Sequence, residues 1–265
     1  MPEGHTIHRI ARDHTPLLVG RPVGAASPQG RFAAGAALLD GRVMTRIEPY
    51  GKHLFHWYEG GVILHVHLGL YGKWTVGTGA PPAPRGALRL RLTTEEAWFD
   101  LRGPIACEPL APEERELVLA RLGPDPLRRD ADPERAWARV TRSGVAIGQL
   151  LMDQGVLAGI GNVYRAEVLY RAGLSPFRPG REVERERWDG MWLDLRTLLR
   201  AGVRSGRIVT TERDDRGRRG GPARREDAHY VYRRTGLPCR RCATPVRTQV
   251  MTTRNLFWCP VCQAT

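Results

Sequence analysis

Residues 157–167 read LAGIGNVYRAE, and this stretch joins two segments with helical spacing. Residues 145–154 and 162–172 both carry apolar residues at intervals of three and four, so the pattern predicts a helix, tight apolar turns, and a second helix opening at Asn162. Glycines in the turns allow a close backbone approach. The free amides at the start of the second helix suit a phosphate group, although Asn162 could instead simply cap its helix.

The C-terminal region carries four cysteines in two CxxC pairs. Cys239 and Cys242 form the first pair, and Cys259 and Cys262 form the second after 16 intervening residues. This spacing predicts one tetrahedral zinc ion. Four thiolates leave no open coordination position, so we expect a structural zinc that holds a small hairpin together. Cys107 stands apart from these pairs and is interpreted as a free core thiol.

Between the two cysteine pairs lies the sequence TTRNLFW, residues 252–258. We expect it to lie on the hairpin or its turn. Hydroxyl, amide and guanidinium groups together suit phosphate binding, and Arg254 is the strongest candidate among them. Any one of these side chains alone is more often a solvated surface residue.

The rest of the chain divides into a β-rich and a helical part. Residues 3–18 have the stripe of an amphipathic helix, with Pro2 at a position where proline begins helices well. Residues 43–102 alternate between apolar and polar side chains, which predicts an antiparallel β-sandwich. Helical spacing is found in residues 113–122, 133–142, 145–154, 162–172 and 184–203.

These patterns predict an α+β fold in three domains. The first, residues 1–125, is a β-sandwich flanked by helices, and the second, residues 126–228, is helical. A zinc hairpin follows in residues 229–265. Residues 213–227 have no apolar side chain larger than alanine, so we expect this basic segment to be mobile.

The composition indicates a polyanion as the partner. The chain has 265 residues, 42% of them hydrophobic, with a formal net charge of +13 and a pI near 10.4. Only two of the 41 basic residues are lysines, Lys52 and Lys73. Codon bias would explain why arginine is used in place of lysine. It would not explain why basic residues outnumber acidic ones. Neither a signal peptide nor a membrane span is apparent, so we expect a cytoplasmic protein. We also expect it to be a monomer.

Several motifs in the sequence resemble those of the formamidopyrimidine-DNA glycosylase and endonuclease VIII family. Residues 157–167 resemble its helix-two-turn-helix signature, MPEG at residues 1–4 resembles its N-terminus, and YGKHL at residues 50–54 is similar to its lysine motif. The zinc hairpin matches as well. The endonuclease VIII branch is favoured because Gly4-His5-Thr6 follows Glu3 and because residues 100–104 lack the Arg-Phe wedge of the other branch.

The resemblance implies a bifunctional DNA glycosylase and abasic-site lyase that repairs oxidised bases. Pro2 would be the nucleophile once Met1 is removed, and Glu3 would transfer protons. Lys52 would contact the lesion phosphodiester and serve in β-elimination, although by itself it reads as an ordinary exposed lysine. Asn162 would hold a neighbouring phosphate, and Arg254 would grip phosphate and assist δ-elimination.

The resemblance also implies residues that fill the gap left by a flipped nucleotide. Leu70 and Tyr71 look like the inserting wedge, although both could instead be core residues at a strand end. Gly69 stands where the branch often has glutamine, and Arg102 is a further candidate DNA contact. His65 and His67 share one face of a strand, and we interpret them as structural rather than metal-binding residues.

Two alternatives stay open at the level of sequence. The first is a glycosylase of the same family that prefers 8-oxoguanine and formamidopyrimidines. The second is a non-catalytic, zinc-containing nucleic-acid-binding protein, which would explain the charge and the cysteines but not the pair Pro2-Glu3. Damaged DNA is the expected partner of the enzyme.

Overall fold

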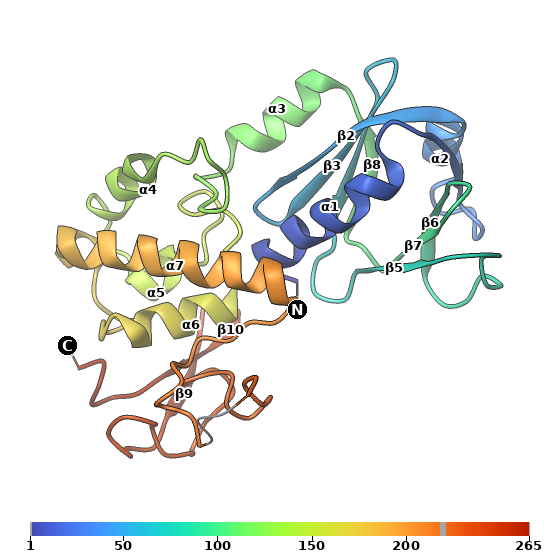
Figure 1. Cartoon of the computed structure of the whole chain (residues 1–265). Helices are drawn as coiled ribbons and strands as arrows, with labels where there is room; N and C mark the ends of the chain where they lie inside the picture. Colours follow the sequence, from blue (N-terminus) through green and yellow to red (C-terminus); the bar gives the residue numbers. More distant parts are fainter. Residues whose placement is uncertain (1, 218–220, 265) are drawn as a thin grey trace. The chain divides into compact units, whose positions relative to one another are not determined.

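The computed structural model describes residues 2–217 and 221–264 (Figure 1). The chain divides into two compact units, residues 1–121 and residues 122–265. None of the helices in the described ranges has the combination of length and apolar character needed to cross a bilayer.

The N-terminal unit opens with the predicted amphipathic helix, α1 (Gly4–Leu18). Its buried face includes Ile7, Ala11 and Leu18, as the sequence spacing predicted. The helix begins later than the proline suggested, because Glu3 occupies the N-cap position in an extended conformation. Pro2 therefore precedes the cap and is not the first helical residue.

An eight-stranded antiparallel sheet forms the body of this unit, in the order β5-β7-β6-β1-β2-β3-β4-β8. The strands are β1 (Pro22–Ala26), β2 (Arg42–Tyr50), β3 (His53–Tyr58), β4 (Ile63–His67), β5 (Lys73–Gly77), β6 (Leu88–Thr93), β7 (Trp98–Arg102) and β8 (Ala106–Leu110). The helices α2 (Ala33–Leu39) and α3 (Pro112–Ala120) complete the unit. The sequence pattern had missed β1, α2 and β8.

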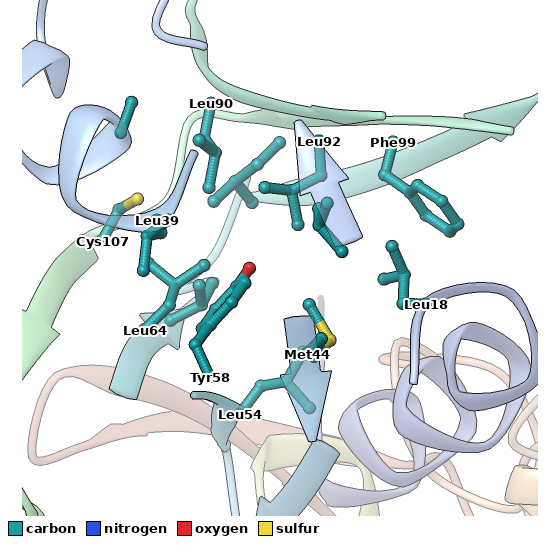
Figure 2. Close-up of a cluster of buried hydrophobic side chains, with 14 of the residues drawn as sticks. Leu18, Leu39, Met44, Leu54, Tyr58, Leu64, Leu90, Leu92, Phe99 and Cys107 are labelled. Atoms are coloured by element: carbon teal, nitrogen blue, oxygen red, sulfur yellow. The ribbon is translucent and has the colours of Figure 1, made fainter. Parts of the chain in front are cut away.

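Strand β1 connects the two layers of a β-sandwich. Pro22 and Val23 pair with β2, whereas residues 24–26 pair with β6, so the strand passes from one layer to the other. Side chains of the two layers then meet in one core. Figure 2 shows Leu54, Tyr58 and Leu64 from β3 and β4 opposite Leu90, Leu92 and Phe99 from β6 and β7. The predicted β-sandwich is confirmed, and Cys107 lies in its core as a free thiol.

The C-terminal unit contains α4 (Pro133–Val140), α5 (Ile147–Leu150), α6 (Asn162–Arg171) and α7 (Arg185–Ser205). A short 3-10 helix spans Gly180–Glu182. Helix α5 is much shorter than the predicted 145–154. The Asp153 carboxylate accepts a hydrogen bond from the backbone N–H of Gly155 at 2.8 Å, which favours a turn over helix continuation.

The last part of this unit is the two-stranded hairpin β9 (Arg247–Met251) and β10 (Arg254–Trp258). Val246, Phe257 and Cys259 pack with Tyr170 of α6 and with Tyr230, so the hairpin shares a core with the helical part. The fold thus combines the predicted sandwich, helix-two-turn-helix arrangement and terminal hairpin.

Candidate functional site

The N-terminus places a proline directly in front of a buried carboxylate. Glu3 has no exposed surface, and its backbone carbonyl accepts the N–H of Thr6 at 2.8 Å at the opening of α1. Pro2 is half-buried. Burial also lowers the pKa of the adjacent His5 to about 4, so this imidazole is neutral near pH 7. Glu3 is the carboxyl group that follows Pro2 in the chain.

Lys52 lies at the tip of the hairpin that joins β2 to β3. Tyr50 and His53 pair across a two-residue turn, in which Gly51 adopts a positive φ of 56°. A two-residue hairpin turn of this kind needs such a conformation, which glycine adopts without strain. Lys52 itself is half-buried, so it is not the ordinary exposed lysine of the alternative interpretation.

Histidines beside Lys52 form a chain of contacts across the sheet. His53 Nδ1 lies 2.8 Å from His65 Nε2, and His65 Nδ1 lies 2.9 Å from a carboxylate oxygen of Glu108. Burial lowers the pKa of His53 to about 3 and that of His67 to about 4. These residues are neutral polar parts of the sheet. The sequence could not reveal the link to Glu108, because it depends on β4 pairing with β8.

The turn between β4 and β5 presents the two candidate wedge residues. The turn is closed by a hydrogen bond from the N–H of Gly72 to the carbonyl of Leu68 at 2.9 Å. Tyr71 is 87% exposed, so its interpretation as a core residue is wrong. Leu70 is half-buried.

Gly69 precedes this turn for a steric reason. Its φ is +66°, and a Cβ there would lie 2.5 Å from Ile105 Cγ2. A glutamine at this position would therefore need both a strained backbone and movement of Ile105. Ile105 was missed by the sequence analysis, which had no signal for an isolated isoleucine after Gly103-Pro104.

Arg102 ends β7 and is held inside the N-terminal unit. Its guanidinium donates to Asp100 Oδ2 at 2.8 Å and to the carbonyl of Arg85 at 3.3 Å. Asp100 is fully buried and also accepts two hydrogen bonds from Arg91. Arg102 thus helps to neutralise a buried carboxylate, and its contact with DNA stays a prediction.

Asn162 connects the helix-two-turn-helix segment to the terminal hairpin. Gly161 is the N-cap of α6, so the interpretation of Asn162 as a cap is wrong. Asn162 Nδ2 instead donates to the carbonyl of Asn255 at 3.0 Å, and its Oδ1 accepts from Arg165. Arg165 also donates to the Asn255 carbonyl at 3.3 Å. The side chain of Asn162, at the start of α6, is therefore held against the hairpin by these hydrogen bonds.

Arg254 begins β10 immediately after the hairpin turn. It pairs with Met251 across Thr252 and Thr253, and Thr252 has a φ of 60°. Arg254 precedes Asn255, the residue whose carbonyl Asn162 contacts. The two predicted phosphate ligands of this unit, Asn162 and Arg254, are therefore supported by the same strand.

The four cysteines meet as predicted and fit zinc. All four sulfur atoms lie within 4.8 Å of one another, with Cys239 to Cys262 at 3.8 Å and Cys242 to Cys259 at 3.4 Å. Zn–S bonds of about 2.3 Å in a tetrahedron separate sulfur atoms by roughly 3.8 Å. Backbone N–H groups of Arg241 and Cys262 also point at sulfur atoms. The cluster holds one structural zinc ion, whose bound thiolates fix the base of the hairpin.

The basic segment 213–227 is described in part. Asp215 accepts from the hydroxyl of Tyr230 at 2.5 Å, and Arg216 donates to the side chain of Thr211 at 3.0 Å. The prediction that the segment is mobile also covers residues 218–220, which lie outside the described residues.

Comparison with known proteins agrees with this arrangement along nearly the whole chain. Residues 1–105 match the Formamidopyrimidine-DNA glycosylase N-terminal domain, residues 122–214 match the Formamidopyrimidine-DNA glycosylase H2TH domain, and residues 236–265 match the zinc finger found in FPG and IleRS. Endonuclease 8 1 of Mycobacterium tuberculosis is 50% identical over 99% of this chain and 100% of the relative. This chain belongs to the formamidopyrimidine-DNA glycosylase family.

Solved structures support the same membership. The crystal structure of the MutM (Fpg) protein from Thermus thermophilus has a TM-score of 0.78 at 31% identity, covering 99% of this chain and 98% of that one. A complex of the Lactococcus lactis Fpg with DNA containing an abasic site has a TM-score of 0.82 at 20% identity, covering 99% and 100%; this likeness concerns the fold alone. The prediction of a DNA glycosylase of this family, on the endonuclease VIII side, is confirmed.

Proposed function

We propose that this protein is a bifunctional DNA glycosylase and abasic-site lyase that removes oxidised bases, preferentially pyrimidines, from DNA. The observation that carries the proposal is the position of Pro2 directly before the buried Glu3 at the opening of α1. A terminal proline offers a secondary amine, and the neighbouring carboxyl group offers a proton carrier.

The reaction begins with the nitrogen of Pro2 after removal of Met1. A terminal α-amino group has a reference pKa of about 7.7 to 8.0, so a useful fraction is neutral near pH 7. The neutral amine attacks C1′ of the damaged nucleotide, the bond to the base breaks, and the base leaves with a proton. The proline nitrogen then loses its proton, the C1′–O4′ bond of the sugar ring breaks, and O4′ takes up a proton. The iminium that forms between the nitrogen and C1′ holds the ring-opened sugar on the protein. Glu3 transfers protons at the sugar during this step.

Strand cleavage follows from the iminium. Loss of a proton from C2′ expels the 3′ phosphate in β-elimination, and a second elimination expels the 5′ phosphate. Lys52, at the tip of the β2–β3 hairpin, contacts the phosphodiester and the sugar of the lesion and takes part in the first elimination. Arg254 grips phosphate and assists the second. Hydrolysis finally releases the proline amine.

The remaining candidate residues of each unit bind DNA. Asn162 and the amides at the opening of α6 suit a phosphate next to the lesion. Leu70 and Tyr71 fill the gap that the flipped nucleotide leaves, which suits the 87% exposure of Tyr71. A net charge of +13 favours the DNA backbone as partner. The DNA-bound Lactococcus lactis relative supports this partner.

The preference for oxidised pyrimidines is supported by the 50% identity to an endonuclease 8. The competing candidate is an enzyme that prefers 8-oxoguanine and formamidopyrimidines, favoured by the 31% identity to the Thermus thermophilus Fpg. Duplex oligonucleotides that each carry one defined lesion separate the two. Faster release of thymine glycol and dihydrouracil than of 8-oxoguanine is expected, and the reverse order would overturn the pyrimidine preference.

An abasic-site duplex tests the chemistry itself. Cleavage at the site is expected for a lyase, whereas binding without cleavage would identify a non-catalytic nucleic-acid-binding protein. Glu3→Gln should slow base release on a lesion duplex while the terminal amine stays in place. Unchanged base release by this variant would contradict the role of Glu3.

A further inference from the structure

We propose that His53 is a positioning residue for Lys52: it accepts a hydrogen bond from the ammonium group of Lys52 and so orients that group. Two further side chains, His65 and Glu108, hold the ring of His53 in the form that can accept. The proposal deepens the proposed function and rests on it, because Lys52 takes part there in the first elimination. His53 acts through Lys52 and does not itself touch the reacting atoms.

Three side chains from neighbouring strands form a continuous chain of hydrogen bonds. Glu108 of β8 pairs with His65 of β4, and His53 of β3 lies diagonally opposite His65. His65 Nδ1 lies 2.9 Å from Glu108 Oε1, and His65 Nε2 lies 2.8 Å from His53 Nδ1. The two ring planes are inclined by only 17°, and the ring centroids are 5.1 Å apart. The rings therefore lie end to end, with a nitrogen of one directed at a nitrogen of the other.

The carboxylate sets the direction of both hydrogen bonds. An ionised carboxylate has acceptors only, so Nδ1 of His65 carries a proton and donates to Glu108. A neutral imidazole has a single N–H, so Nε2 of His65 is unprotonated and accepts from the Nδ1–H of His53. The one proton of the His53 ring is then on Nδ1. The chain therefore leaves His53 with an unprotonated Nε2, which is a hydrogen-bond acceptor.

Both rings are neutral near pH 7, as this assignment of protons requires. Burial is the main cause that lowers the pKa of His53 to about 3. Burial also lowers the pKa of His65, against the opposing effect of Glu108. A ring with so low a pKa is a poor base. His53 therefore holds an N–H of Lys52 by a hydrogen bond and does not remove the proton.

Lys52 is the donor next to this acceptor. It directly precedes His53 at the tip of the β2–β3 hairpin, and an ammonium group has three N–H donors and no acceptor. The charge of Lys52 contributes to the lowered pKa of both His53 and His67, so it lies near both rings. Nδ1 of His67 already accepts the N–H of Gly69 at 3.0 Å, so a neutral His67 carries its proton on Nε2. Of these two histidines, His53 therefore provides the acceptor.

A fixed acceptor matters for a lysine because its side chain is long and flexible. The side chain has a large rotamer entropy, so a hydrogen bond to a rigid ring narrows the region in which the ammonium group lies. Accurate placement of a participating group raises the rate of the bound substrate. The other end of the chain, Glu108, is 52% exposed. Its effect on strand cleavage should reach Lys52 through the two histidine rings.

Single-turnover cleavage of an abasic-site duplex tests the role of His53. His53→Leu removes the acceptor and should slow cleavage about tenfold, the loss expected for a hydrogen bond to a charged group. In a Lys52→Ala background the same change should have little further effect, because the group that His53 orients is gone. His53→Gln offers both an N–H and a carbonyl oxygen and should recover most of the rate. Equal losses with and without Lys52 would overturn the positioning role.

Glu108 is tested by removing its acceptor oxygens or only its charge. Glu108→Ala should slow cleavage, whereas Glu108→Gln keeps an acceptor oxygen and should retain most of the rate that Glu108→Ala loses. Glu96→Ala is the matched control, since Glu96 is 57% exposed and pairs with Arg21 in the same unit. An unchanged rate in Glu108→Ala, or an equal loss in Glu96→Ala, would overturn the role of the chain.

Nitrogen NMR of wild-type protein with isotopically labelled histidines tests the chain without any substitution. Near pH 7, His53 and His65 should both carry their proton on Nδ1, whereas His67 should carry it on Nε2. The signals of His53 are assigned by their loss in His53→Gln. A proton on Nε2 of His53 would overturn its role as an acceptor and leave the lyase proposal intact. No abasic-site cleavage by the wild-type protein would overturn both.

Discussion

The side-chain amide of Asn162 donates a hydrogen bond to the backbone carbonyl of Asn255 at 3.0 Å. This contact joins the first residue of α6 to the strand that follows Arg254. The side chain that we propose to bind phosphate at the start of α6 is thereby held by the hairpin. The two proposed phosphate-binding elements of the C-terminal unit, α6 and the hairpin, are therefore joined by a direct hydrogen bond.

We predict that Asn162→Ala weakens binding to an abasic-site duplex roughly tenfold, because a buried hydrogen bond of about 1 to 3 kcal/mol is lost together with its phosphate contact. Asn255→Ala is the matched control, since the contact uses only the backbone of Asn255 and its side chain is exposed. Titration by fluorescence anisotropy measures both. In the double variant with Arg254→Ala, the losses should be less than additive. Full additivity would mean that the two residues act independently.

Zinc removal should affect one unit and spare the other. In Cys242→Ser one of the four sulfur ligands is lost, so we expect loss of zinc and of DNA affinity together. The sandwich core of the N-terminal unit has no part in this cluster and should remain folded. Zinc content, DNA titration and hydrogen exchange of β3 provide the three measurements. A zinc-free protein with full cleavage activity would contradict the structural role of the metal.

Arg254→Ala should slow the second elimination more than base release, because a phosphate ligand that assists the last step acts after attack on C1′. Resolving the product ends on a gel distinguishes β- from δ-products over time. Arg247→Ala, at the other end of the hairpin, provides the control, since Arg247 pairs with Trp258 far from the turn. An unchanged proportion of δ-product with slower base release would contradict the proposed role.

Acid should destabilise the N-terminal unit through buried histidines. His56 has no exposed surface, and burial, followed by the nearby His14, lowers its pKa from 6.5 to about 3. Burial lowers the pKa of His14 to about 4, with Asp13 acting in the opposite direction. The folded state keeps both rings neutral, whereas the unfolded chain binds protons below pH 6.5. Stability is therefore complete above pH 6.5 and declines as the pH falls towards 3 to 4.

At pH 5 the difference amounts to about 2 kcal/mol for His56 alone. Hydrogen exchange of the β3 amides, corrected for the intrinsic effect of pH, should report this loss of protection between pH 7.5 and pH 5. His56→Leu removes the titrating group and should reduce the pH dependence by that amount. An unchanged pH dependence in the variant would show that His56 does not contribute.

The sequence was most informative where a pattern is local. The amphipathic stripe of residues 3–18, the alternation of residues 43–102 and the spacing of the cysteines predicted α1, the sandwich and the zinc cluster. Contacts between distant segments left no such signal. The pairing of Glu108 with His65 depends on β8 lying beside β4, and the support of Asn162 by Asn255 depends on a hairpin 93 residues away.

Two features that the sequence did not predict correctly, the end of α5 and the glycine at position 69, have physical causes. Residues 151–154 keep helical spacing, yet α5 ends at Leu150, and the hydrogen bond from the N–H of Gly155 to the Asp153 side chain favours a turn after it. Gly69 looked like a missing glutamine, but its positive φ and the neighbouring Ile105 mean that a side chain there would strain the backbone and displace Ile105. Neither effect can be seen before the chain is folded.

The central claim is that Pro2 performs the chemistry through a free secondary amine. A retained Met1 or an N-terminal tag turns this amine into an amide, whose nitrogen lone pair is delocalised into the carbonyl. Such a protein should lose all cleavage but bind DNA as before, because the zinc hairpin and α6 are unchanged.

Borohydride trapping followed by peptide mapping tests this claim most directly. Borohydride added during turnover on an abasic-site duplex reduces the iminium to a stable amine, so the DNA remains covalently attached to its nucleophile. We expect the adduct on the N-terminal peptide at Pro2, and we expect none with the blocked protein. An adduct on Lys52 or Lys73, or cleavage by a verified N-terminally blocked protein, would contradict the mechanism.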